Sequence, residues 1–266
     1  MLNGLTQINV ELTSRCDKST LCTFCGHQDP EIYPTIRFGD MRIDLLERLA
    51  AALPPGIVVQ FHRDGDPLAF PLIAEVLPLF ARQIRSIVTH GERLGDPRGL
   101  SIIGLCESVT VSVFRGDPDR TLQLTALRTF LKEKGDALPR VHLKVVGDMS
   151  SVDLDSYLAL DVPIMRRKIH VPIGNSRYAG GLPAMPEHGI CLDLLHHPSV
   201  AWDGRVYLCN RLDTKDAGLI GNLTHHSLDT IWNGPLRAAA IAHHLQGRRD
   251  LVPPCVGCLY YGIPTA

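Results

Sequence analysis

The sequence predicts an α/β protein, built from a parallel sheet that is open or barrel-like and a small C-terminal unit. Three observations support this class. Through about the first 170 residues, short alternating apolar runs alternate with segments of helical periodicity, a pattern typical of parallel sheets. From Gly174 to Pro186 the sequence changes to Gly, Pro, Asn and Ser without periodicity. Seven of the eight cysteines fall into two groups, one on each side of this change.

Six strands are predicted in the first unit, at residues 7–12, 57–61, 86–89, 108–114, 141–146 and 165–171. In the first of them, Ile8, Val10 and Leu12 recur at every second position, as in a strand with one buried face. In an open sheet or a barrel, the active face lies at the carboxyl ends of such parallel strands.

Helices are predicted between these strands, at residues 43–53, 71–82, 99–105, 117–135 and 153–160. The first has apolar residues at helical spacing and stops at Pro54-Pro55. In the fourth, Asp117 is the predicted N-cap, Pro118 lies in the first turn, and Leu124 to Leu131 supply a buried stripe.

The predicted domain boundary separates residues 1–185 from residues 186–266. In the second unit, Asp203-Gly204 predicts a hairpin over 200–208, because this dipeptide supplies the positive φ angles of a tight turn. Short helices are predicted at 227–232 and 236–245. The unit has too little apolar sequence for a strong core of its own, and a metal site would compensate.

The overall composition is that of an ordinary globular protein, with 45% apolar and 21% charged residues among 266. Lysine and arginine (27) nearly balance aspartate and glutamate (28), so no general positive field attracts nucleic acid or anionic lipid. No apolar run is long enough to span a membrane, and the N-terminal residues lack the pattern of a signal peptide. We therefore expect a cytoplasmic protein, monomeric or a small homo-oligomer.

The cysteines are expected to bind metal rather than to form disulfides, because a chain without an export signal lies among reducing thiols. One group comprises Cys16, Cys22 and Cys25. Cys106 is isolated and is predicted to be a small buried core residue. The second group falls in the last third of the chain, at Cys191, Cys209, Cys255 and Cys258.

The first group has the spacing C-x5-C-x2-C in the loop after the first strand. Three thiolates can hold three irons of a [4Fe–4S] cluster and leave the fourth iron open for a substrate or cofactor. The alternative is a zinc site in which His27 joins the three thiolates.

The run Cys22-Thr23-Phe24-Cys25-Gly26 resembles the end of the cysteine motif of radical S-adenosylmethionine (radical SAM) enzymes, with an aromatic residue before the last cysteine. The usual spacing in that family is C-x3-C-x2-C, so this chain has two more residues in the first gap. The resemblance implies a partial (β/α)6 TIM-like barrel, a SAM-binding [4Fe–4S] cluster at the three cysteines, and a cofactor contact at Phe24.

Further segments resemble SAM-contacting positions of the same family, each at the end of or on a predicted strand. Taken alone, each also fits a plain strand-end turn. Asp64-Gly65-Asp66-Pro67 is similar to the family's Gly-Gly-Glu-Pro, and Thr89-His90-Gly91 to its Thr-Asn-Gly. The resemblance implies SAM-binding roles for Asp64, Gly65, Asp66, Thr89, His90, Ser112 and Lys144.

The second cysteine group can hold either a closed [4Fe–4S] cluster or an all-cysteine zinc ion, and spacing alone does not choose between them. The run Ala201-Trp202-Asp203-Gly204 through Cys209, followed by Ile220-Gly221-Asn222-Leu223 and Pro254-Cys255, resembles the auxiliary-cluster extension called SPASM. With four cysteines the extension looks like the shortened, one-cluster twitch version. This resemblance implies a second [4Fe–4S] cluster.

The combined resemblance implies that SAM binds the open iron, that one electron cleaves a sulfur–carbon bond of SAM, and that a 5′-deoxyadenosyl radical abstracts a substrate hydrogen. The cofactors carry this chemistry, and the protein positions them. The implied partners are a reductant such as flavodoxin or ferredoxin and a small-molecule, nucleotide or peptide substrate.

The auxiliary cluster is expected to accept an electron from the substrate radical, which gives a net oxidation. One alternative is radical modification or rearrangement of a nucleotide, DNA base or peptide with a structural auxiliary cluster. Another is a non-catalytic module that binds two zinc ions.

Other polar residues are assigned by their place relative to the predicted strands. His62, Arg63 and Arg115 lie at strand ends and are candidates for binding an anionic or hydroxylated substrate. The histidine pairs are interpreted as solvated or capping residues of surface turns: His196-His197, His225-His226 and His243-His244.

Overall fold

A computed structural model of the chain describes residues 2–18, 22, 25, 27, 34, 36–146, 151–167, 190–210, 213, 215–256 and 258. All eight cysteines are among them, whereas Phe24 lies outside the described residues, as does the segment 168–189 that contains the predicted domain boundary.

Nine strands form one sheet within these residues. They are β1 (Gln7–Val10), β2 (Val58–Phe61), β3 (Ile84–Thr89), β4 (Ser108–Val113), β5 (Arg140–Val146), β6 (Ile164–Arg167), β7 (Ser199–Val200), β8 (Arg205–Tyr207) and β9 (Leu219–Asn222). Their order is β6-β5-β4-β3-β2-β1-β7-β8-β9, and every pair from β6 to β7 is parallel. The predicted α/β class with six parallel strands in the first unit is confirmed.

The strand ends differ slightly from the predicted ones. The first strand was expected to continue to Leu12, but β1 ends at Val10. Beyond that point the chain pairs with a later segment, since Met41 donates to the Leu12 carbonyl at 2.8 Å and Thr13 bridges Asp40. The loop after β1 is therefore fixed at its start. The last four residues of the predicted sixth strand, 168–171, lie outside the described residues.

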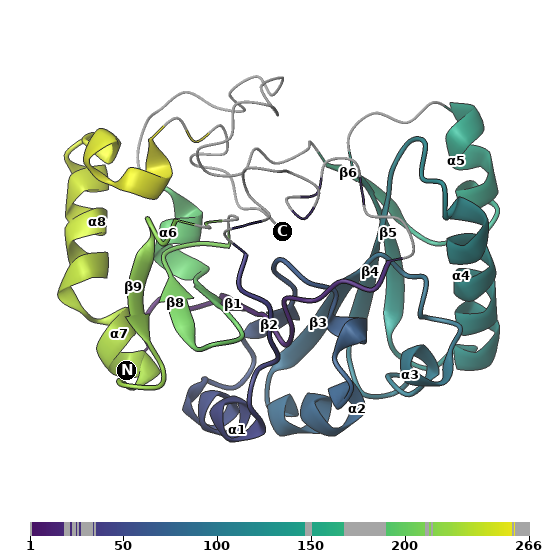
Figure 1. Cartoon of the computed structure of the whole chain (residues 1–266), viewed down its shortest axis with the longest axis horizontal. Helices are drawn as coiled ribbons and strands as arrows, with labels where there is room; N and C mark the ends of the chain where they lie inside the picture. Colours follow the sequence, from purple (N-terminus) through teal and green to yellow (C-terminus); the bar gives the residue numbers. More distant parts are fainter. Residues whose placement is uncertain are drawn as a thin grey trace.

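The helices of the first unit lie along the outer face of the curved sheet (Figure 1). They are α1 (Ile43–Ala52), α2 (Ile73–Val76), α3 (Pro97–Leu100), α4 (Arg120–Lys134) and α5 (Ser151–Leu158), with the 3-10 turns η3 (Pro67–Ala69) and η4 (Leu77–Phe80). Helix α1 ends as predicted, because Leu53 precedes Pro54 and takes an extended ψ of 137°. Among the described helices, none combines the length and apolar character needed to cross a bilayer.

Three helix predictions need correction. The short helix expected over 99–105 is α3, which ends at Leu100, and residues 101–105 form turns. The single helix expected over 71–82 is divided into α2 and η4, because Pro78 has no N–H to continue the α-helical ladder. Asp117 is not the N-cap of α4, which begins after Asp119. The Asp117 carboxylate instead accepts from Lys18 and from the Asp119 N–H. Asp117 therefore forms a long-range ion pair with Lys18 and does not cap the helix in the way that the local pattern predicts.

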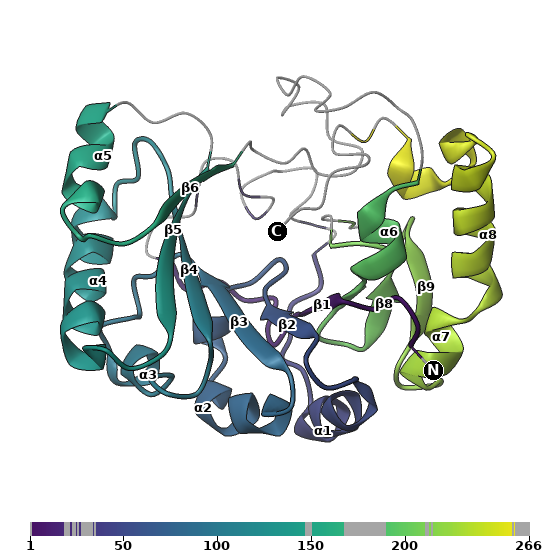
Figure 2. The same cartoon turned by 180° about the vertical axis from the view of Figure 1, so that it is seen from behind.

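The C-terminal extension continues the same sheet beyond β1, on the side away from β3 to β6 (Figure 2). It contains α6 (Leu192–His196), α7 (Leu228–Trp232), α8 (Pro235–Leu245), η6 (Arg249–Leu251) and η7 (Pro253–Cys255). The predicted hairpin is confirmed, since β7 and β8 are antiparallel and Gly204 between them has φ +86°. The two predicted helices correspond to α7 and α8.

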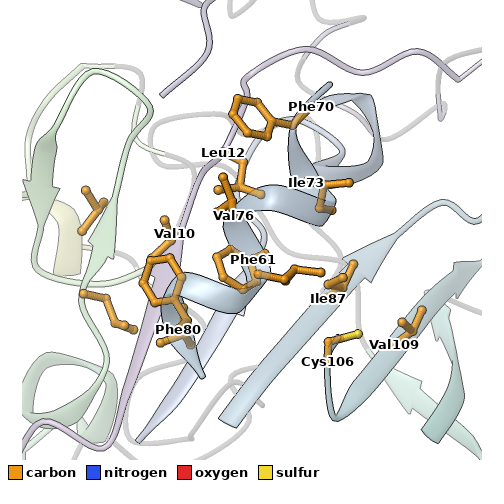
Figure 3. Close-up of a cluster of buried hydrophobic side chains, with 14 of the residues drawn as sticks. Val10, Leu12, Phe61, Phe70, Ile73, Val76, Phe80, Ile87, Cys106 and Val109 are labelled. Atoms are coloured by element: carbon orange, nitrogen blue, oxygen red, sulfur yellow. The ribbon is translucent and has the colours of Figure 1, made fainter. Parts of the chain in front are cut away.

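The core is one continuous cluster of buried side chains. Under the first unit, Phe61 of β2 meets Phe80 of η4 edge to face, with ring centroids 5.2 Å apart (Figure 3). Cys106 is fully buried in this region, as predicted. The same cluster includes Val206, Ile231 and Trp232 of the extension. The extension therefore shares the core of the barrel, which explains how its short apolar sequence suffices.

The β7–β8 hairpin of the extension also packs against residues 37–39, which follow the first cysteine loop. The Trp202 ring lies against Gly39, where an added Cβ would come within 2.3 Å of the ring, and the indole N–H donates to the Arg37 carbonyl at 2.8 Å. Only glycine fits this approach. The contact links the first cysteine loop to the extension.

Candidate functional site

The candidate site lies where the parallel strands end. The loop with Cys16, Cys22 and Cys25 follows β1, Asp64 and Asp66 follow β2, and His90 follows β3. Since the strands are parallel neighbours, these loops meet at one edge of the sheet.

The three cysteines of the first group are close enough to influence one another. The Cys25 N–H donates to the Cys22 carbonyl at 2.8 Å, and the His27 N–H donates to Cys25 Sγ at 3.4 Å. Burial, with the charge of Asp66, raises the pKa of Cys16 to about 12. Burial, with the neighbouring Cys25, raises the pKa of Cys22 to about 12. Each thiol is thus protonated at neutral pH in the absence of metal, and a metal must displace the proton on binding.

The longer arm between the first two cysteines carries a buried cation. Lys18 Nζ lies 2.6 Å from Glu92 Oε1, 2.9 Å from Asp117 Oδ1 and 2.9 Å from Asp119 Oδ2, and its side chain is 1% exposed. Burial alone would lower the pKa of Lys18, but the three carboxylates outweigh it and raise that pKa. The cysteine loop is thereby fastened to the loops after β3 and β4.

Asp17, the residue before Lys18, makes a second fastening. Its carboxylate pairs with Arg93, and its Oδ1 lies 3.4 Å from His90 Nε2. Burial opposes ionisation, yet the hydrogen bonds from His90 and Arg93 lower the pKa of Asp17 to about 2. Asp17 and Lys18 therefore both hold the segment between Cys16 and Cys22 against the loop that follows β3.

Asp66 ties the ends of β2 and β3 together. One carboxylate oxygen accepts from the Leu68 N–H at 2.8 Å, and the other accepts from Thr89 Oγ1 at 2.7 Å and from the His90 N–H at 2.8 Å. The predicted site residues Asp66, Thr89 and His90 are thus brought together. Burial lowers the pKa of His90, but the charges of Asp66, Asp17 and Glu92 reverse this and raise it above its usual value.

A second buried charge cluster surrounds Arg63. Its Nη1 lies 2.8 Å from Asp64 Oδ2 and 3.5 Å from Glu11 Oε2, and its guanidinium stacks 4.5 Å from the Tyr207 ring. The Arg63 side chain is 4% exposed, and its Nε and Nη2 find no hydrogen-bond acceptor among the residues that the structure describes. Glu11 accepts from the N–H groups of Asp64 and Trp202, both at 3.1 Å. The cluster therefore joins β1, β2 and the extension.

Glu11 predicts a pH dependence of stability. Burial, with the charge of Asp64, outweighs Arg63 and raises the pKa of Glu11 to about 7 from an ordinary 4.5. The folded protein then holds a proton that the unfolded chain releases, so stability present below pH 4.5 is lost as the pH rises to 7, by about 3 kcal/mol. Urea unfolding between pH 5 and 8 should show this loss in the wild type relative to Glu11→Gln. Parallel pH profiles of the two proteins would contradict it.

The other predicted residues of the barrel are more dispersed. Ser112 on β4 is in register with Lys144 on β5, which is 9% exposed. The backbone carbonyl of His62 accepts from Asn9 at 3.0 Å. Arg115 is exposed, so it is not drawn into either charge cluster.

The second cysteine group comes together within the extension. Cys191 precedes α6, Cys209 follows β8, and Cys255 ends η7, with the Cys258 N–H donating to the Cys255 carbonyl at 3.2 Å. Burial raises the pKa of Cys255, and the neighbouring Cys209, Cys191 and Cys258 add to the effect. His244 contacts this group, with Nε2 3.3 Å from Cys255 Sγ.

In the described ranges, neither cysteine group has the geometry of a single-ion metal site. Within the described part of the chain, no group of three or more His, Cys, Asp or Glu side chains is arranged to hold one metal ion. The His27 ring, the fourth ligand of the zinc alternative, lies edge-on to Phe38 with centroids 5.5 Å apart. The metal-ligand assignments therefore stay predictions.

Sequence reasoning missed Glu11, Lys18 and His244. The histidine pairs were expected at the surface, but His197 and His244 are buried, at 5% and 2% exposure. One signal was present for His244: it follows Ala240 by four residues, so both lie on the same, buried face of α8. No local pattern identifies the partners of Lys18, which lie 74 to 101 residues further along the chain.

The C-terminal extension matches a known family. Residues 191–259 match SPASM, described as an iron-sulfur cluster-binding domain, and all four cysteines of the second group lie within them. A search of curated proteins found no match.

Solved structures resemble the whole described fold. The crystal structure of BtrN in complex with AdoMet and 2-DOIA has a TM-score of 0.60 at 16% identity, with 96% of this chain and 92% of that chain covered. Streptococcus suis SuiB bound to S-adenosylmethionine has a TM-score of 0.65 at 13% identity, with 90% and 68% covered. A second SuiB structure is bound to the precursor peptide SuiA, at a TM-score of 0.61 and 12% identity, with 90% and 67% covered. The chain therefore has the fold seen in BtrN and SuiB, and its C-terminal residues 191–259 match the SPASM iron–sulfur cluster-binding domain.

Proposed function

We propose that the chain is a radical SAM enzyme that binds two [4Fe–4S] clusters and SAM. The SAM-binding cluster is held by Cys16, Cys22 and Cys25, and the auxiliary cluster by the four cysteines of the extension. When bound, the first cluster would supply the one electron that cleaves SAM to methionine and a 5′-deoxyadenosyl radical, and this radical would abstract a substrate hydrogen.

One observation carries the proposal: seven of the eight cysteines gather in two groups, and the second group lies wholly within the SPASM match. The first group follows β1 at the edge where parallel sheets bind ligands. BtrN and SuiB, which share the fold, are both seen with S-adenosylmethionine. A set of three thiols suits an open iron, and a set of four suits a closed cluster.

The residues around the first group have distinct tasks in this proposal. Lys18 and Asp17 hold the cysteine loop, and Asp66 aligns the strand ends that carry Thr89 and His90. The Asp66 carboxylate, which accepts three hydrogen bonds and has His90 Nε2 3.4 Å from its Oδ2, is itself a candidate for a SAM contact. The remaining candidates for SAM contacts are Phe24, Asp64, Gly65, Ser112 and Lys144.

The substrate is proposed to be oxidised, with the auxiliary cluster as electron acceptor and flavodoxin or ferredoxin as the reductant of the first cluster. Arg63 and His62 follow β2 and are candidates to hold an anionic or hydroxylated group, and Arg115 is a weaker candidate because it is exposed. A peptide substrate is supported by the SuiB structure with its precursor peptide, and a small molecule by BtrN with 2-DOIA.

Anaerobic reconstitution tests the two clusters separately. The wild type should bind about eight irons, and two triple variants about four each: Cys16→Ala/Cys22→Ala/Cys25→Ala and Cys191→Ala/Cys209→Ala/Cys255→Ala. The control Cys106→Ala removes a core thiol and should keep eight. A colourless protein with two zinc ions would overturn the proposal in favour of a zinc module.

A further inference from the structure

The inference concerns His244 and the second cysteine group, and it rests on the proposed auxiliary cluster. His244 lies near the end of α8, and its ring reaches Cys255 at the end of η7. Its side chain faces the core of the extension and is almost fully buried, with the residue at 2% exposure. Nε2 lies 3.3 Å from Cys255 Sγ, within hydrogen-bond reach of a sulfur acceptor.

A second polar group favours negative charge at the same turn. Arg249 Nη1 donates to the Cys258 carbonyl at 3.4 Å, which places a positive charge beside the turn. The Cys255–Cys258 turn is therefore approached by the imidazole ring of His244 and by the guanidinium of Arg249. Both stabilise a thiolate more than a thiol.

Hydrogen bonds to the sulfurs of an iron–sulfur cluster withdraw electron density and tune its reduction potential. We propose that His244 is a positioning residue for the auxiliary cluster: its Nε2–H donates to the Cys255 thiolate and raises the potential of the cluster. A raised potential favours one-electron reduction of the cluster, which is the direction needed for an acceptor of the substrate's electron. Groups that orient metal ligands in this way commonly affect the metal site as much as some ligands do.

The test uses variants that differ in where they place an N–H group. Glutamine places its amide nitrogen near the position of histidine Nε2, whereas the shorter asparagine does not reach it. His244→Gln should therefore keep the wild-type potential, and His244→Asn and His244→Phe should lower it. His225→Phe is the matched control, because His225 is an exposed histidine of the same extension.

The measurement is a redox titration of the reconstituted enzyme followed by electron paramagnetic resonance. We expect the ratio of oxidised to reduced auxiliary cluster, at a fixed potential, to rise at least tenfold in His244→Asn, which is a shift of 59 mV for one electron. Equal potentials in His244→Asn, His244→Gln and the wild type, all with about eight irons, would overturn the inference and leave the proposed function intact. A wild type with only four irons would overturn the proposed function itself.

A second measurement covers variants that fail to bind the auxiliary cluster. In metal-free protein at pH 9, alkylation of Cys255 by iodoacetamide reports its thiolate fraction through peptide mass spectrometry. We expect this alkylation to slow about threefold in His244→Asn, the effect of roughly half a pKa unit, and to keep its rate in His244→Gln. Identical rates in all three proteins would contradict the hydrogen bond.

Discussion

Replacing Lys18 with methionine is expected to lower the free energy of unfolding by about 3–5 kcal/mol, the cost of removing one partner from a buried ion cluster. Glu92, Asp117 and Asp119 would be left close together without the cation that lies within 2.9 Å of each. Because methionine has nearly the volume of lysine, the loss in the free energy of unfolding measures the effect of removing the positive charge. Urea unfolding of the metal-free protein at pH 7.5 measures it.

The control for Lys18 is Lys132→Met on the exposed face of α4. A surface substitution of this kind should change the free energy of unfolding by less than about 0.5 kcal/mol. We also expect Lys18→Met to lose iron from the first cysteine group, because its loop is no longer fastened to β3. Equal stability and equal iron content in Lys18→Met and Lys132→Met would refute the structural role of the cluster.

Gly65→Ala is expected to disturb the start of the cysteine loop. An added Cβ would lie 2.3 Å from the Thr13 carbonyl oxygen and 2.6 Å from that of Arg15, and both are backbone atoms that cannot swing away. The Asp66 N–H donates to the same Arg15 carbonyl at 2.9 Å, so this bond would be strained as well. Overpacking of this kind costs about 1–3 kcal/mol or more.

Iron analysis after reconstitution shows where the disturbance acts. Gly65→Ala should keep about four irons, those of the extension. The control Gly56→Ala has open space around the added Cβ but φ +77°, so it should cost about 1 kcal/mol through the backbone alone and keep all the iron. Full iron content in Gly65→Ala would show that the close approach is unimportant for the loop.

Local patterns in the sequence were sufficient for most of the fold. Strand β4 has alternate buried residues because Val109, Val111 and Val113 occupy every second position. Asp203-Gly204 located the hairpin correctly. The helix expected over 71–82 is divided because Pro78 lies inside its apolar stripe and has no N–H to donate. The shared core of barrel and extension could not be foreseen, because it depends on β7 pairing with β1, nearly 190 residues away.

The sequence predicts those site residues whose type alone indicates their chemistry, such as the cysteines. It does not predict residues whose role depends on a partner far away in the chain. The two cysteine groups were recognised by spacing alone. No local pattern marks Lys18, and its role exists only because the loops after β3 and β4 bring three carboxylates to it. His244 looked like one of a surface pair, and its burial follows from the packing of α8 against η7. Tertiary contacts between distant segments decide both.

The central claim is that the first cysteine group serves SAM cleavage. It is tested most directly by measuring 5′-deoxyadenosine released from SAM by the anaerobically reconstituted, dithionite-reduced protein. We predict release by the wild type and by the variant that lacks Cys191, Cys209 and Cys255, and none by the variant that lacks Cys16, Cys22 and Cys25. An iron-loaded wild type that releases no 5′-deoxyadenosine, or undiminished release without the first three cysteines, would contradict the claim.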